Sequence, residues 1–195
     1  MNLLKKGNHK LSKQVGIFTL PTHTCIGSGI CRKFCYADKG YTRFKKCVQS
    51  RENKFNISRQ ENFIELITTE IKKMKKIKAI RIHESGDFYS QEYLNKWKYI
   101  AKQFPNLIFH CYTKSLILDL WSNLSENFII FQSLGGKFDN KVDLTKNTAR
   151  VDILKKIDVD EFICPYSNSD FTKCFEYCNE CFDTKTFKHV VFHIH

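Results

Sequence analysis

The chain has few of the residues that interrupt or link structural units. It holds three prolines and eight glycines in 195 residues, and it has no Gly/Ser/Pro-rich linker, internal repeat or low-complexity tract. We therefore expect one domain over residues 1–195. No run approaches the roughly 18 apolar residues of a membrane span. The first residues, MNLLKKGNHKLSKQ, lack the apolar core of a secretory signal. These absences predict a cytoplasmic protein with no membrane partner.

Acidic residues are scarce in the first part of the chain. Residues 1–81 hold 19 Lys/Arg against five Asp/Glu, a net charge of +14, whereas residues 82–195 hold 13 against 15, a net of −2; together they give +12. A basic region of this kind attracts nucleic acid, a nucleotide-like cofactor or another polyanion. Arginine is also rare, at six residues against 26 lysines, so a lysine-rich, solvated surface is the competing interpretation.

Patterns typical of strands and helices alternate along the chain. Apolar runs predict strands at residues 15–20, 78–83, 107–112, 128–132, 161–164 and 190–194. Helices are expected after a Ser58/Glu61 capping box, from the Ser90 cap to Pro105, over 116–124 and over 148–157. This pattern favours a partial, open βα barrel of five to six mostly parallel strands, with a doubly wound sheet as the alternative. We expect residues 1–163 to form the barrel core and residues 164–195 a cysteine-rich, metal-binding segment.

Polar sequence follows each of the first five predicted strands. These loops are THTC, ESGDF, TKS, SLGG and CPYS in chain order. Ligands of parallel α/β folds bind beyond the carboxyl ends of the strands. We therefore expect these loops to share one face of the molecule, together with the two groups of cysteines that begin in the first and the last of them.

Seven of the nine cysteines fall into two groups. The N-terminal cysteine group is Cys25, Cys31 and Cys35, and the C-terminal cysteine group is Cys164, Cys174, Cys178 and Cys181. An odd total and a reducing compartment both argue against a disulfide framework. Three thiolates leave a coordination position open, whereas four complete a tetrahedral zinc site or a cubane iron–sulfur site.

The residues alone leave the identity of the metal open. Uneven gaps of ten, four and three positions in the C-terminal cysteine group favour a cubane over the paired knuckles of a zinc ribbon. In the N-terminal cysteine group, zinc with His23 as a fourth ligand competes with a three-cysteine cubane. Cys47 is either a further ligand or an isolated thiol, and Cys111 is most simply a core residue.

The sequence RIHESGDF at residues 81–88 places charged groups at a strand end. Gly86 permits a tight turn that holds Asp87 over the sheet, where a carboxylate binds ribose or an amino group or moves a proton. The alternative for Asp87 is an Asx-turn that caps the next helix. Polar residues after the following strands, among them Tyr112, Lys114 and Ser133, would complete a pocket. Strand alternation places the other side chains on two sides, with Arg81, His83 and Ser85 on one and Ile82 and Glu84 on the other.

Five segments carry a family resemblance. They are GNHKLSK at residues 7–13, the T-C-x5-C-x3-CYA block at 24–37, RIHESGDFYSQEYLNKW at 81–97, YTKS at 112–115 and the C-terminal CP…C…C..CF block. Through these segments, which span most of the chain, the sequence resembles a phage-encoded family, the gene-product-88-like proteins. A phage origin would place the protein in the cytoplasm of a host cell.

More distantly, the layout resembles radical S-adenosylmethionine enzymes, which have a partial or full βα barrel and a three-cysteine loop after the first strand. This resemblance implies a [4Fe-4S] cluster on the N-terminal cysteine group and an auxiliary cluster on the C-terminal one. It further implies bound S-adenosylmethionine, an electron donor, and a small-molecule or macromolecular substrate. Cofactor contacts would come from Ser85, Gly86, Asp87, Lys114 and Ser133. Catalytic roles, positioning cofactor or substrate, would fall to Glu84, Asp87 and Tyr112.

Two other functions are open from the residues. A non-catalytic nucleic-acid-binding protein would use iron–sulfur or zinc centres structurally and bind its partner through the basic residues 1–81. A zinc-dependent hydrolase would use Glu84 or Asp87 as its general base.

Overall fold

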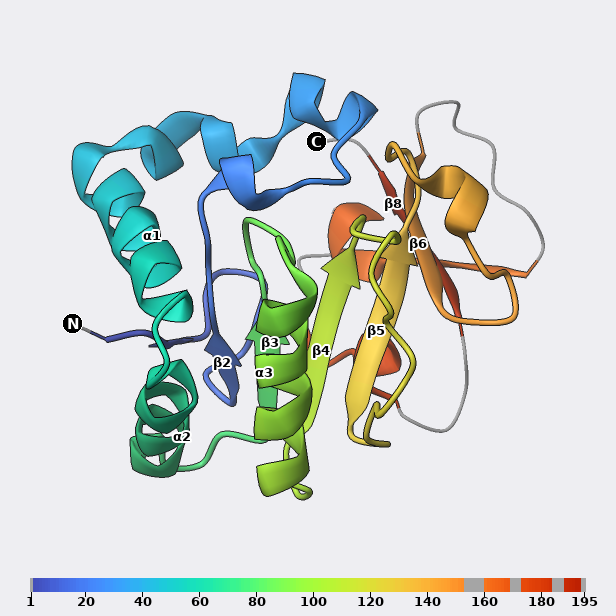
Figure 1. Cartoon of the computed structure of the whole chain (residues 1–195). Helices are drawn as coiled ribbons and strands as arrows, with labels where there is room; N and C mark the ends of the chain where they lie inside the picture. The colour runs from blue at the N-terminus through green and yellow to red at the C-terminus, as the bar shows by residue number, and fades with distance from the viewer. Residues whose placement is uncertain (1, 153–159, 169–172, 184–187, 194–195) are drawn as a thin grey trace.

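The strands of the chain assemble into one mostly parallel sheet, seen in a computed structural model that describes residues 2–152, 160–168, 173–183 and 188–193. The eight strands lie in the order β1-β2-β3-β4-β5-β6-β8-β7, and the sheet is not closed (Figure 1). β1 pairs antiparallel with β2, and the other pairings are parallel. The strands are β1 (Lys5–Lys6), β2 (Val15–Ile17), β3 (Ala79–Ile82), β4 (Ile108–Thr113), β5 (Phe128–Ser133), β6 (Thr148–Asp152), β7 (Glu161–Ile163) and β8 (His189–His193).

Three α-helices lie within the described residues, α1 (Lys45–Ser58), α2 (Phe63–Lys73) and α3 (Gln91–Gln103). In α2, Phe63, Ile67 and Ile71 recur every four positions and are buried, which gives the helix one apolar face. The predicted cap of α3 is confirmed, because the Ser90 side chain accepts a hydrogen bond from the Tyr93 amide at 3.2 Å. None of the helices in these ranges is long and apolar enough to cross a membrane.

Different parts of the chain cover the two faces of the sheet. α2 and α3 pack on the face that carries Phe18, Ile80, Ile82, Phe109, Cys111, Phe128 and Ile130. The other face packs against the C-terminal part of the chain, whose orange and red segments lie behind β4 and β5 in Figure 1. The strands run in chain order from β1 to β6, and β8 lies between β6 and β7. This arrangement differs from the doubly wound alternative.

Short 3₁₀ helices make up most of the connection from β2 to α1. They are η1 (Thr22–Thr24), η2 (Ile30–Phe34), η3 (Tyr36–Asp38) and η4 (Gly40–Arg43), with η5 (Asp139–Lys141), η6 (Pro165–Asn168) and η7 (Glu180–Phe182) elsewhere. Figure 1 shows this connection passing over one end of the sheet before it enters α1. The connection contains the N-terminal cysteine group.

All six predicted strand regions are confirmed, but the expected number of strands was too low. The two-residue β1 and the strand β6 were not predicted. β6 occupies residues 148–152, where a helix was expected, because that segment pairs in parallel with both β5 and β8. The remaining residues of that expected helix, 153–157, lie outside the described residues.

The helix expected after the Ser58/Glu61 capping box is confirmed as α2, but its predicted cap was wrong, as was the helix expected over residues 116–124. Ser58 does not cap a helix start; it ends α1, and its hydroxyl donates to the Phe55 carbonyl at 2.7 Å. Residues 116–124 form turns rather than a helix. There, Asp119 Oδ1 accepts hydrogen bonds from the Trp121 and Ser122 amides, which competes with helical pairing of the backbone.

Candidate functional site

The loop of the N-terminal cysteine group docks on the carboxyl ends of β4 and β5. A Cβ on Gly27 would lie 1.8 Å from the carbonyl oxygen of Lys114, directly after β4. A Cβ on Gly29 would lie 2.6 Å from the carbonyl oxygen of Gly135, just after β5. The Lys137 amide donates to the Gly27 carbonyl at 3.0 Å. Only glycine at these two positions lets the backbone approach the strand ends so closely.

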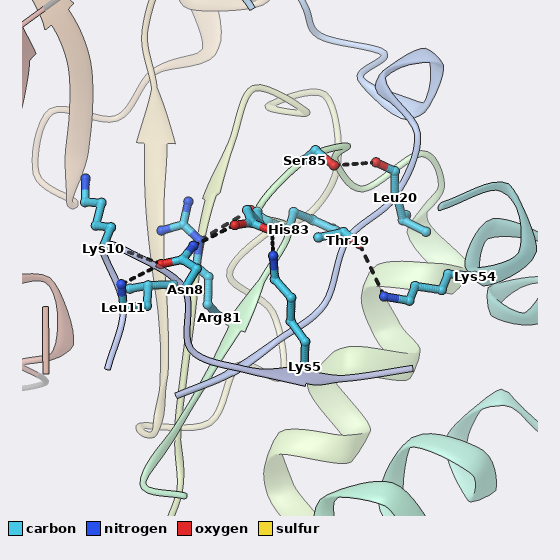
Figure 2. A network of polar contacts seen from close by, with 11 residues as sticks. Lys5, Asn8, Lys10, Leu11, Thr19, Leu20, Lys54, Arg81, His83 and Ser85 are labelled. Carbon is cyan, nitrogen blue, oxygen red and sulfur yellow. Dashed lines mark hydrogen bonds and ion pairs between the residues drawn. The ribbon is translucent and has the colours of Figure 1, made fainter. Parts of the chain in front are cut away.

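The ESGDF loop after β3 holds the start of the same connection. The Leu20 amide donates to the Ser85 carbonyl, and the Ser85 hydroxyl donates to the Leu20 carbonyl, both at 2.8 Å (Figure 2). The Asp87 amide donates to the Thr24 hydroxyl at 3.1 Å. Because Thr24 immediately precedes Cys25, these contacts fix the first cysteine relative to β3.

The Asp87 carboxylate is engaged by donors from two strand ends. Oδ1 accepts from the Thr113 hydroxyl at 2.6 Å and the Phe88 amide at 2.7 Å, and Oδ2 accepts from the Lys114 amide at 2.8 Å. Burial raises the pKa of Asp87 to about 6, although these hydrogen bonds oppose the rise. Gly86, at φ +80°, makes the turn before it. Asp87 therefore ties β3 to β4, while the cap of α3 is Ser90, so the helix-capping alternative for Asp87 was wrong.

Lys114 and Ser133 join β4 to β5 beneath the cysteine loop. Lys114 Nζ donates to the Ser133 hydroxyl at 2.9 Å, to the Ser133 carbonyl at 3.0 Å and to the Leu134 carbonyl. Burial lowers the pKa of the Lys114 ammonium, and the nearby thiol of Cys31 opposes that effect. Both predicted cofactor-binding residues thus lie next to the N-terminal cysteine group.

The three thiols of the N-terminal cysteine group are half-buried and influence one another. Burial raises the pKa of Cys25 to about 12, and the Asp87 carboxylate and the Cys35 and Cys31 thiols add to the rise. Burial also raises the pKa of Cys35. Such thiols keep their protons at neutral pH until a metal ion displaces them.

The two candidate fourth ligands lie toward α1. His23 Nδ1 is 3.5 Å from a Glu52 carboxylate oxygen, and the His23 ring packs edge-to-face on Phe55 with centroids 5.1 Å apart. Cys47 is in the first turn of α1 and is half-buried. His23 is therefore engaged by side chains of that helix.

The C-terminal cysteine group lines a single cavity. The cavity is small, with a volume of about 10 Å³. The lining consists of all four cysteines of the group together with Phe162, Pro165, Tyr166 and Phe182. A backbone hydrogen bond holds Cys174 against the N-terminal part of the chain. The Cys174 amide donates to the Lys10 carbonyl at 2.8 Å.

Two donors reach sulfur atoms of this group. The Tyr112 hydroxyl donates to Cys181 Sγ at 3.0 Å, and Lys10 Nζ lies 3.7 Å from Cys164 Sγ. Burial raises the pKa of Cys181 to about 12, and the Tyr112 hydrogen bond opposes the rise. Burial likewise raises the pKa of Cys174, and the Lys10 ammonium opposes it. Both donors favour the thiolate form. Within the described ranges, no three or more His, Cys, Asp or Glu side chains are grouped so that they could hold a metal ion.

Tyr112 connects the C-terminal cysteine group to a polar cluster on the same face of the sheet. The Arg81 guanidinium lies 4.2 Å from the centroid of the Tyr112 ring. An Arg81 nitrogen is also 3.1 Å from His110 Nδ1. Tyr112 was predicted to act with Glu84 and Asp87, but the contact found for its hydroxyl is with Cys181.

The predicted side for His83 was wrong. β3 ends at Ile82, and His83 adopts φ +64°, which breaks the alternation of the strand. The His83 ring packs on Phe88 at 4.6 Å, and its Nε2 is 3.0 Å from the Tyr93 hydroxyl. His83 therefore lies with Ile82 on the face covered by the helices, opposite Arg81.

Glu84 contacts two residues near the beginning of the chain. The sequence had not indicated a partner for this carboxylate. Its carboxylate accepts from Asn8 Nδ2 and pairs with Lys5 Nζ, each at 2.6 Å. Figure 2 shows Lys5, Asn8 and Lys10 gathered beside Arg81. Asn8 and Lys10 were not predicted as site residues. The signal that could have indicated them was the GNHKLSK segment, one of the five that carry the family resemblance.

Comparison with known proteins gives one match. A family model described as Gene product 88 matches residues 2–187. No curated protein and no solved structure matches the chain.

Proposed function

The chain belongs to the Gene product 88 family, and from this premise and the placement of its cysteines we propose that it is an iron–sulfur protein with two [4Fe-4S] clusters. The C-terminal cysteine group holds a complete, structural cluster. The N-terminal cysteine group holds an open cluster that binds S-adenosylmethionine, which makes the protein an enzyme similar to the radical S-adenosylmethionine enzymes.

The observation that carries the proposal is that four cysteines from an 18-residue stretch line one small cavity, although within the described residues they are not grouped closely enough to hold a metal ion as they stand. The donor set fits a sulfur-ligated centre, because four thiols are the ligands that iron–sulfur clusters take. The surroundings fit as well. Phe162, Tyr166 and Phe182 line the cavity, and hydrogen bonds from Tyr112 and Lys10 to sulfur atoms stabilise anionic ligands.

The N-terminal cysteine group suits the open cluster. It supplies three thiols, so one position is free for a further ligand. Its loop lies at the carboxyl ends of parallel strands, where α/β folds bind their ligands. When bound, S-adenosylmethionine and a reduced cluster would supply the radical chemistry.

The chain's own residues fix the geometry of that site. Gly27 and Gly29 allow the loop to sit on the strand ends. Asp87 is a positioning residue, since its carboxylate holds the ends of β3 and β4 together under the loop. Lys114 is a second positioning residue that joins β4 to β5. The carboxylate of Glu84 is held by Lys5 and Asn8, and we assign it to positioning the cofactor or substrate.

Anaerobic purification followed by iron, sulfide and zinc analysis tests the proposal. We expect about eight irons and eight sulfides per chain for two cubanes. Replacing the three N-terminal cysteines by serine should leave about four irons, as should replacing the four C-terminal ones. Cys47→Ser tests the remaining candidate thiol ligand and should retain all the iron, because the proposal leaves the fourth position of the N-terminal cluster to S-adenosylmethionine.

Catalysis is tested separately. The reduced, cluster-loaded protein should convert S-adenosylmethionine to 5′-deoxyadenosine, and the variant without the N-terminal cysteines should not. Zinc without sulfide would refute the cluster assignment. A fully loaded protein that forms no 5′-deoxyadenosine would refute the catalytic one.

A further inference from the structure

Exposed apolar side chains concentrate in one short segment. Within the described residues, ten large apolar side chains are exposed, and five of them fall in residues 30–48. Three of the five are aromatic. Tyr41 is 59% exposed and Phe44 67%; Tyr36 is 60% exposed, although burial of its hydroxyl end, near Arg81 and Glu84, raises the pKa of that group. Rings that are this exposed gain little from the protein core and are available for contact with a partner.

The same segment carries a strong positive charge. It holds six basic residues against one acidic residue, a net charge of +5. All six basic side chains are exposed, and they are Arg32, Lys33, Lys39, Arg43, Lys45 and Lys46. We call residues 30–48 the aromatic–basic surface.

The backbone of the aromatic–basic surface is held in place from within. The Thr42 hydroxyl donates to the Tyr36 carbonyl at 3.1 Å, which brings η3 and η4 together. The Arg51 guanidinium, on α1, donates to the Ala37 carbonyl at 2.9 Å and to the Thr42 carbonyl at 2.6 Å. A surface fixed in this way loses less conformational entropy when it binds.

We propose that the aromatic–basic surface binds single-stranded nucleic acid, with bases stacked on Tyr36, Tyr41 and Phe44 and phosphates beside the surrounding cations. Exposed rings interleaved with lysine and arginine are the combination that single strands require, because each base offers a flat face and each nucleotide a negative charge. A duplex hides the faces of its bases. An acidic protein would match the charge but would leave the separate rings without partners.

This inference does not rest on the proposed iron–sulfur function. It does place the bound strand next to the N-terminal cysteine group, since Cys31 and Cys35 lie within the aromatic–basic surface. Figure 1 shows this part of the chain at the end of the sheet where that group docks.

The test is fluorescence anisotropy of a labelled 20-nucleotide oligothymidylate with the full chain. Four phosphate contacts would weaken binding about 50-fold between 50 mM and 200 mM salt, because each contact on a single strand adds about −0.7 to the logarithmic slope. Alanine at Tyr36, Tyr41 or Phe44 should each weaken binding at least about fivefold. Tyr99→Ala removes a ring that is 56% exposed on α3, and it should leave the affinity unchanged.

Charge is tested with a matched pair of double variants. Lys45→Gln with Lys46→Gln should weaken binding and flatten the salt dependence, whereas Lys72→Gln with Lys73→Gln, exposed on α2, should do neither. The conservative variant Tyr41→Phe should bind like the wild type, and thermal unfolding checks that each variant is folded. Absence of binding at low salt would overturn the proposal. The proposal would also fail if polyglutamate displaced the labelled oligonucleotide as well as unlabelled oligothymidylate does, and if the ring variants bound with unchanged affinity. Those two results together would indicate an acidic protein partner.

Discussion

Gly27→Ala should release the N-terminal cysteine group from the sheet while leaving the rest of the protein folded. The added Cβ would lie 1.8 Å from the Lys114 carbonyl oxygen, where an ordinary contact begins at 3.4 Å, so the loop must retreat by 3.4 − 1.8 = 1.6 Å. That movement breaks the hydrogen bond from the Lys137 amide to Gly27. The lost hydrogen bond costs about 1 kcal/mol, and the overpacking about 1–3 kcal/mol. We expect the free energy of unfolding to fall by about 2–4 kcal/mol.

The assay combines urea unfolding with iron analysis after anaerobic purification. Gly27→Ala should lose the iron of the N-terminal site and retain about four irons at the C-terminal one. Gly40→Ala is the control. It has no atom within 4 Å of the added Cβ, and its left-handed backbone, at φ +54°, costs about 1 kcal/mol. A Gly27→Ala protein with full iron and wild-type stability would refute the docking of this loop on β4.

Three further predictions concern charges and sulfur. Burial raises the pKa of Asp87 from 3.8 to about 6, so the folded state binds this proton more tightly, and stability should rise by about 3 kcal/mol as pH falls from above 6 to below 4. Asp87→Asn should remove this contribution from the pH profile of thermal unfolding, and an unchanged profile would contradict it. Tyr112→Phe should leave the iron content intact but make the reduction potential of the C-terminal centre more negative, because a hydrogen bond to Cys181 is lost; an unaltered redox titration would count against that contact. Burial raises the pKa values of Cys25 and Cys181 to about 12, so metal uptake must displace protons and should become tighter as pH rises from 6 to 8; pH-independent uptake would be inconsistent with protonated thiols.

The sequence predicts best those parts of the fold that depend on local pattern. Apolar runs identify six of the strands, and the Ser90 cap places the start of α3. α1 was not predicted, because its composition is polar and only Lys54 and Ser58 are fully buried on it. β6 was mistaken for a helix, because its conformation depends on pairing with β5 and with the distant β8.

Much of the candidate site depends on contacts between distant parts of the chain. Asp87 and Lys114, from polar loops that the sequence places after parallel strands, lie close to the thiols of Cys25 and Cys31. The local sequence does not reveal that Lys10 lies beside Cys164, because 154 positions separate them. Nor does it reveal the left-handed backbone of His83, which ends the alternation of β3.

The open position on the N-terminal cluster is the central claim, and electron paramagnetic resonance tests it most directly. The sample is the chain with the four C-terminal cysteines replaced by serine, reconstituted with iron and sulfide and then reduced. We predict the signal of one reduced [4Fe-4S] cluster, and a change in that signal when S-adenosylmethionine is added. A cluster signal that S-adenosylmethionine does not alter, in a variant that remains folded, would contradict the account.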